Sequence, residues 1–93
     1  MRTIDRSAAF KRDYKREAKG RHRQTLDDDL VAVLTALLDD VALEARYRDH
    51  DLSGEWLGYR DCHVKPDLVL IYRKPDKDTL RLARLGSHSE VFG

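Results

Sequence analysis

Hydrophobic residues recur with a two-residue period in the last third of the chain, and this period predicts the strands of a small sheet. Residues 67–74 read DLVLIYRK, in which both alternating sets of positions are apolar. β-Branched and aromatic residues favour strands, and apolar side chains on both faces indicate a strand that is buried on two sides. This segment is therefore the expected centre of the sheet.

The segments on either side extend the pattern. Residues 79–86 (TLRLARLG) alternate again, and the polar break at 75–78, which contains a proline, is suited to a turn. Residues 58–64 (GYRDCHV) also alternate and reach the central strand through Lys65-Pro66. Three antiparallel strands in meander order are expected, and residues 1–5 (MRTID) are short enough to be an edge strand.

The first half of the chain has the helical period instead. Ser7 is a good N-cap, Phe10 and Tyr14 follow at helical spacing among basic residues, and Gly20 suits a left-handed C-terminal position. Residues 25–28 (TLDD) resemble a capping box and precede a leucine-rich stripe to residue 38. We expect two helices, the second with its leucine stripe packed on the sheet; a role of this stripe in dimerisation is the alternative. Residues 46–56 are expected to form a long polar loop, a kind of segment that often carries function.

Composition narrows the class of protein. Ninety-three residues suffice for one domain, residues 1–93, and the net charge of +1 hides basic residues gathered in the first 24 positions. The single cysteine, Cys62, excludes an internal disulfide and a cysteine-based metal cluster. No apolar run reaches 18 residues and no signal peptide opens the sequence, so a cytoplasmic protein without membrane contact is expected.

Candidate chemistry rests on histidine. The sequence has no glycine-rich phosphate loop and no Gly-x-Ser-x-Gly elbow. His50, His63 and His88 fall in positions that a meander could bring together, with Asp67 at the start of the central strand. Their spacing is poor for zinc, whereas imidazoles that titrate near pH 6.5 suit general acid–base catalysis.

Two further residues each allow two interpretations. Arg84 shares its expected face with Leu80 and Leu82, so it needs either a carboxylate partner, Asp61 or Asp67, or an anionic ligand such as phosphate. Phe92 is either a plug of the core or a platform for base stacking. Arg60 and Lys65 are further candidates for contacts with RNA phosphates, and no metal site is expected.

Short motifs are dense from residue 47 to residue 93. They are Tyr47-Arg48-Asp49-His50, Leu52, Gly54, Trp56, Gly58-Tyr59-Arg60-Asp61, His63-Val64, Pro66-Asp67, Leu70-Ile71-Tyr72, Arg84, Gly86-Ser87-His88 and Phe92-Gly93. Together these motifs resemble those of the YafQ branch of the RelE superfamily of bacterial toxin endoribonucleases, whereas the helices match only weakly.

This resemblance implies an α+β fold, with two N-terminal helices packed on an antiparallel sheet. It also implies cleavage of messenger RNA in the A site of the 70S ribosome without a metal or other cofactor. The family's catalytic positions match His50, His63, Asp67, His88 and Phe92. His88 would be the general acid and Asp67 or His50 the base, while His63 would position a phosphate or proton and Phe92 a base.

The resemblance also implies a partner. Such toxins are held inactive by a cognate antitoxin, often as a heterotetramer that binds operator DNA only through the antitoxin. The alternative is a non-catalytic RelE-like module that binds antitoxin or RNA and cuts nothing.

Overall fold

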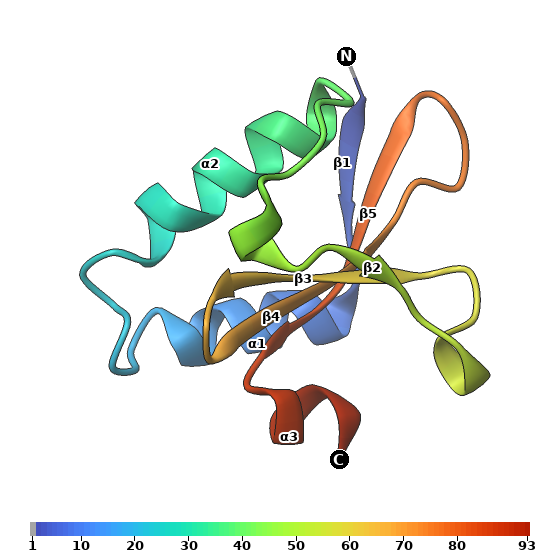
Figure 1. Ribbon diagram of the computed structural model, residues 1–93. Helices are drawn as coiled ribbons and strands as arrows, with labels where there is room; N and C mark the ends of the chain where they lie inside the picture. The colour runs from blue at the N-terminus through green and yellow to red at the C-terminus, as the bar shows by residue number, and fades with distance from the viewer. Residues whose placement is uncertain (1) are drawn as a thin grey trace.

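The structure is a computed structural model that describes residues 2–93 as one five-stranded sheet with helices (Figure 1). Its elements are β1 (Thr3–Arg6), α1 (Ala8–Glu17), α2 (Leu26–Leu38), the 3-10 turn η1 (Ala45–Tyr47), β2 (His50–Asp51), the 3-10 turn η2 (Gly54–Trp56), β3 (Arg60–Lys65), β4 (Leu68–Arg73), β5 (Thr79–Gly86) and α3 (His88–Phe92). The strand order is β1-β5-β4-β3-β2. All pairings are antiparallel except that of β1 with β5. The expected α+β fold is confirmed. The parallel orientation of the edge strand β1, the short strand β2 and the short third helix were not expected.

The central strand β4 is buried on both faces, as its sequence predicts. Leu68, Leu70 and Tyr72 belong to the large core on the helix side, whereas Val69 and Ile71 belong to a smaller apolar cluster on the opposite face. Each of these five side chains is at most 2% exposed. The meander of β3, β4 and β5 is confirmed.

The two N-terminal helices supply the rest of the large core. Ser7 caps α1 by accepting a hydrogen bond from the Phe10 N–H at 2.9 Å, as expected. The leucine stripe of α2 packs within the molecule, through Leu26, Leu30, Val33 and Leu37. An amphipathic helix that buries its apolar stripe in this way derives most of its stability from that contact.

Two expectations about helix ends are wrong. α1 ends at Glu17 with Ala18 as a right-handed C-cap, and Gly20 is not among the glycines with positive φ. Thr25 makes no capping hydrogen bond with its side chain. The first turn of α2 is instead joined to the preceding turn, because the Leu26 N–H donates to the His22 carbonyl oxygen at 2.9 Å.

The outer edge of β5 is covered by two different elements. β1, the expected edge strand, begins at Thr3 and pairs with residues 79–82; Met1 lies outside the described residues. Beyond that point, side chains of α1 and its cap replace the missing strand. The Ser7 hydroxyl donates to the Ala83 carbonyl at 2.8 Å, and Asp13 accepts from the Leu85 N–H at 3.0 Å. An edge closed in this way does not offer free backbone groups to another chain.

Within residues 2–93, none of the helices has both the length and the apolar character that crossing a bilayer requires.

Candidate active site

The face of the sheet opposite α1 and α2 carries the candidate site. Residues 46–56 were expected to form a loop throughout, and this is wrong. The turns η1 and η2 and the strand β2 lie within or across this range. β2 has only two residues, yet it pairs with β3 and sets His50 directly opposite Asp61. His63 lies opposite Val69, so it shares the face of the smaller apolar cluster. The sheet register thus places two of the expected histidines on one face.

Asp61 is the buried carboxyl on this face, with 2% of its surface exposed. His50 Nδ1 lies 3.0 Å from Asp61 Oδ1 and 2.8 Å from the Arg48 carbonyl oxygen. The Arg48 carbonyl and an ionised Asp61 can both only accept, so Nδ1 carries the proton, and only the contact with Arg48 has the geometry of a hydrogen bond. Asp61 Oδ1 consequently has no hydrogen-bond partner among the described residues. Arg48 adopts the left-handed conformation, φ 50° and ψ 41°, which few non-glycine residues adopt.

Burial raises the pKa of the Asp61 carboxyl above its ordinary value, and the positive charges of His50, His63 and His88 act to lower it. Of the three expected catalytic histidines, His50 is in contact with Asp61, and the other two act on it through longer-range charge. Sequence reasoning considered Asp61 only as a possible partner of Arg84. The available signal was its place in the alternating set that contains His63.

The helix α3 carries His88 and Phe92 on the same side of the sheet as the smaller apolar cluster. Ser87 and Glu90 form a reciprocal capping box, so the helix begins at His88. The Ser-x-x-Glu pattern could have predicted this helix from the sequence. The rings of His88 and Phe92 lie 4.6 Å apart, and Phe92 also packs against the smaller apolar cluster. An open groove passes these residues, lined by Pro66, Asp67, Ser87, His88, Ser89, Phe92 and Gly93.

Asp67 lies in the turn between β3 and β4 and is held by the connection between α1 and α2. His22 Nε2 lies 3.0 Å and 3.2 Å from the two carboxylate oxygens of Asp67, and Arg21 pairs with the same group. Asp67 thus reaches the groove beside His88 but is already bound by two donors. Sequence reasoning missed this role of His22.

Arg84 has a carboxylate partner, although not one of the two expected. The register shifts between Ile71 and Tyr72, which sets Arg84 opposite Ile71 and takes it out of the row of Leu80 and Leu82. Arg84 Nε donates to Asp13 Oδ2 at 2.7 Å and Nη2 donates to Oδ1 at 3.2 Å. Burial opposes ionisation of Asp13, but hydrogen bonds from Arg84 and the Leu85 N–H leave its pKa below the ordinary value.

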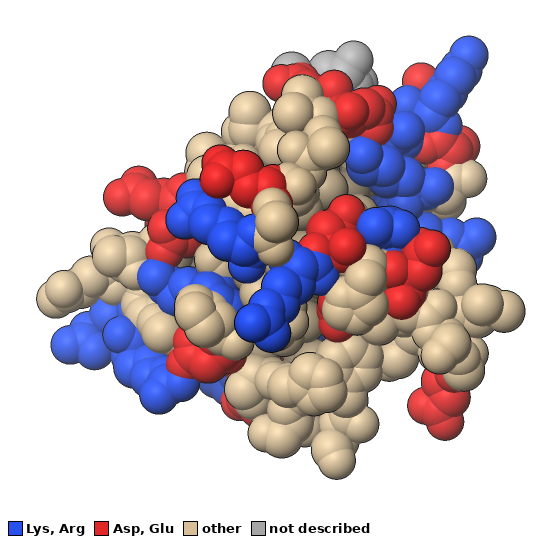
Figure 2. Space-filling view, viewed as in Figure 1, with Lys and Arg blue, Asp and Glu red and all other residues tan. Residues whose placement is uncertain are grey.

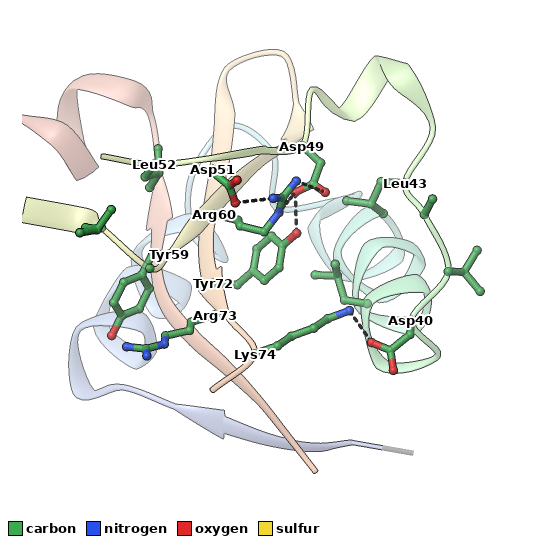
Figure 3. Close-up of a pocket in the computed structure, with 15 residues that line it drawn as sticks. Asp40, Leu43, Asp49, Asp51, Leu52, Tyr59, Arg60, Tyr72, Arg73 and Lys74 are labelled. Carbon is green, nitrogen blue, oxygen red and sulfur yellow. Dashed lines mark hydrogen bonds and ion pairs between the residues drawn. The ribbon is translucent and has the colours of Figure 1, made fainter. Parts of the chain in front are cut away.

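Arg60 and Lys65 lie on the helix side of the sheet, opposite Tyr72 and Leu68 of the large core. Arg60 is opposite Tyr72 on the helix side, where it pairs with Asp49 at 3.0 Å and with Asp51 (Figure 3). The Tyr72 hydroxyl donates to Asp49 as well, and burial together with this bond raises the pKa of Tyr72. Lys65 pairs with Asp29 of α2. Both expected phosphate-binding residues therefore connect the sheet to the elements around it.

Charge on the visible face is mixed rather than uniformly basic. Figure 2 shows acidic and basic side chains interspersed, with a group of basic side chains at the lower left, where the connection between α1 and α2 lies in Figure 1. Within residues 2–93, no group of three or more His, Cys, Asp or Glu side chains is arranged to hold a metal ion.

Comparison with known proteins gives consistent matches over the whole chain. The family model for "Bacterial toxin of type II toxin-antitoxin system, YafQ" matches residues 2–93. The mRNA interferase toxin YafQ of Escherichia coli strain K12 is 42% identical over 94 residues, which covers 100% of this chain and 98% of the relative. The crystal structure of YafQ from E. coli strain BL21(DE3) is similar with a TM-score of 0.84 and 39% identity, and all of both chains is covered. YafQ in the crystal structure of the E. coli DinJ–YafQ complex is similar with a TM-score of 0.83 and 40% identity, again over all of both chains.

Proposed function

This chain belongs to the YafQ family of bacterial type II toxin–antitoxin toxins, and we propose that it is an endoribonuclease that cleaves messenger RNA on the ribosome. The observation that carries the proposal is the contact of His50 with the buried Asp61 on the face of the sheet that also bears His63, together with an open groove lined by His88 and Phe92. A module that only binds has no need of an imidazole held against a buried carboxyl group. Imidazoles suit proton transfer near neutral pH.

The proposed reaction uses a nucleophile that RNA itself supplies. The 2′-hydroxyl attacks the adjacent phosphorus, a new O2′–P bond forms and the P–O5′ bond breaks. A base removes the proton of the 2′-hydroxyl, and an acid gives a proton to the leaving 5′-oxygen. The products are a 2′,3′-cyclic phosphate and a free 5′-hydroxyl. Acid and base assistance of this kind is typically worth about 10²- to 10⁴-fold in rate.

We assign the two proton-transfer roles to His88 and His50. His88 is the general acid, because it lines the groove at the start of α3. His50 is the general base, because its Nδ1 is fixed by Arg48 and its side chain is 56% exposed, which leaves Nε2 for the substrate. Asp67 is less suited to be the base, since His22 and Arg21 already occupy its oxygens.

The other expected residues take positioning roles in the proposal. His63 helps to place the phosphate, and Phe92, in contact with the His88 ring, stacks on a base. Arg84 lies within 3.5 Å of the Glu90 carbonyl of α3, and its Nη1 makes no hydrogen bond within residues 2–93. That nitrogen is the donor proposed for the negative charge of the transition state. Arg60 and Lys65 have no part in the proposed reaction.

Ribosome dependence is supported by the shape of the site. The groove is open and is lined by only a short turn and α3. In-line attack requires the reacting atoms to be held about 3 Å apart in a defined geometry. A groove with so few walls gives little grip on a flexible strand, so we propose that the ribosome holds the messenger RNA in place.

The test maps messenger RNA 5′ ends in a translation reaction, with and without ribosomes, for the wild-type protein and for His88→Ala. Cuts at fixed codon positions should require ribosomes, and His88→Ala should reduce their rate by about 10²-fold or more. Lys77→Ala, at the exposed turn before β5, serves as the control and should leave the cuts unchanged.

Two results would contradict the proposal. Undiminished cutting by His88→Ala would remove His88 from catalysis. An absence of cuts by folded wild-type protein would instead favour the non-catalytic binding module.

The family also implies an antitoxin. YafQ of E. coli has been solved in complex with DinJ, and we propose that a cognate antitoxin binds this chain in a comparable way. Co-expression of that antitoxin should restore growth to cells in which the toxin inhibits it, and the two chains should elute together in size-exclusion chromatography. Separate elution of active toxin and antitoxin would contradict this part of the proposal.

A further inference from the structure

We propose that Asp61 is the positioning residue of the general base, and that it acts through His50 by stabilising the positive charge that His50 acquires during cleavage. The inference rests on the proposed function and adds a residue to its machinery. Only one histidine lies within 4 Å of this carboxylate among the described residues, and that is His50, whose Nδ1 is 3.0 Å from Oδ1.

The other two histidines near Asp61 have different contacts. His63 Nδ1 lies 3.2 Å from the Pro66 carbonyl, so its proton is directed along the β3–β4 turn. The His88 ring contacts Phe92 instead. Both act on Asp61 only through longer-range charge. The pairing of β2 with β3 therefore selects His50 as the histidine that Asp61 serves.

A second buried aspartate shows what a purely structural carboxylate looks like in this fold. Asp13, 3% exposed, is bound by Arg84, by Arg16 and by the Leu85 N–H. Asp61 is equally buried, yet its Oδ1 has no hydrogen-bond partner within residues 2–93. A buried carboxylate oxygen that accepts no hydrogen bond destabilises the fold. Such an oxygen is more typical of functional sites than of structural ones.

The geometry gives the two acceptors near His50 separate tasks. The Arg48 carbonyl accepts a hydrogen bond from Nδ1–H and so fixes which nitrogen faces the substrate. When Nε2 accepts the 2′-hydroxyl proton, the ring becomes a cation whose Nδ1 lies beside the Asp61 carboxylate. The carboxylate stabilises that cation without taking a proton, and the water-poor surroundings strengthen the attraction.

The test is a double-mutant cycle on His50→Ala and Asp61→Asn. Asparagine keeps the shape of the side chain and removes its charge. We expect Asp61→Asn to lower kcat by about 10²-fold and to leave KM within about twofold, because the cation exists only during reaction. Because Asp61 acts through His50, the double variant should be no slower than His50→Ala alone, within about threefold.

Two control variants test whether the effect of Asp61→Asn is specific to Asp61 and to its contact with His50. Asp28→Asn, at an exposed site in the first turn of α2, should cleave as the wild type does. Asp61→Asn combined with His63→Ala should show multiplied losses, since Asp61 is not in contact with His63. Multiplied losses with His50→Ala, or a changed KM with kcat retained, would overturn the proposal.

A measurement without substitution keeps the inference testable if Asp61→Asn does not fold. In the ¹⁵N NMR spectrum of the wild-type protein, neutral His50 should carry its proton on Nδ1 and leave Nε2 bare. A proton on Nε2 would overturn the proposed role of Asp61. Wild-type protein that cuts no RNA would overturn the proposed function itself, and with it this role. If the wild-type protein cuts RNA but the effects of His50→Ala and Asp61→Asn are additive in the double-mutant cycle, only the role of Asp61 is overturned.

Discussion

The burial of the Asp61 side chain has opposite effects on the stability of the fold and on the proposed reaction. Its burial raises its pKa, which means that its ionised form is disfavoured in the folded protein. The same burial places a full negative charge 3.0 Å from His50, where little water screens it. A residue of this kind is expected to weaken the fold in order to serve the reaction.

Asp61→Asn should therefore stabilise the protein while it slows cleavage. A raised pKa means that folded Asp61 binds a proton more readily than unfolded Asp61, so the penalty is present above the folded pKa and disappears as pH falls through it. At pH 7 we expect the Tm to rise by about 4 °C, the shift that about 1 kcal/mol produces in a domain of this size. Thermal unfolding between pH 3 and pH 8 measures this, and the gain should shrink in acid. If Asp61→Asn is less stable than the wild type at pH 7, interactions in the folded protein outweigh the cost of burying the Asp61 charge, and this prediction is wrong.

Among the elements, α1 does more than cover the core. It completes the edge of β5 where β1 ends, and Asp13 is the residue on which this edge depends. The carboxylate accepts from the Leu85 N–H and from two arginines, Arg16 on its own helix and Arg84 on the strand. A helix that provides hydrogen bonds to a strand edge fixes both its own position and that of the strand.

Asp13→Ala should lower the free energy of unfolding by about 3 kcal/mol, because it leaves Arg84 and the Leu85 N–H without their partner. Urea unfolding at pH 7 measures the loss, and Asp28→Ala on α2 should change stability by less than about 0.5 kcal/mol. Since the folded pKa of Asp13 is lowered, its contribution is complete above the unfolded value near 3.9 and is lost as pH falls through the folded one. The difference between wild type and Asp13→Ala should therefore shrink in acid, and a difference that persists there would contradict the ion-pair explanation.

The same elements show how far sequence reasoning extends. β4 and α2 were predictable, since their apolar periods are long enough to exclude other interpretations. The partner of Arg84 was not, because alternation assumes a regular strand and β5 shifts register at that point. His50 and His88 were identified as candidates, but the contact of His50 with Asp61 depends on a two-residue strand that no period can reveal. The contact between His22 and Asp67 joins residues 45 apart and leaves no local signal.

At the scale of the whole molecule, the sheet separates stability from chemistry. The helices α1 and α2 and the large core occupy one face. His50, His63 and α3, which carries His88, occupy the other face beside the small cluster of Val69, Ile71, Ala83 and Val91. Most candidate residues on the second face are partly exposed, so their replacement changes few buried contacts. Loss of activity with retained folding is accordingly the expected result for His50, His63 and His88.

The parallel pairing of β1 with β5 also determines when the molecule can fold during its own synthesis. Asp5 and Arg81, which face each other across this pair, are 76 residues apart, and α1 packs on β5 as well. The first strand and first helix thus have no sheet to join until β5 has emerged from the ribosome that makes it. Contacts so distant along the chain form late. A nascent chain of this toxin therefore remains without an assembled active site, and the ribosome that synthesises it is not exposed to a folded nuclease until β5 has left its exit tunnel.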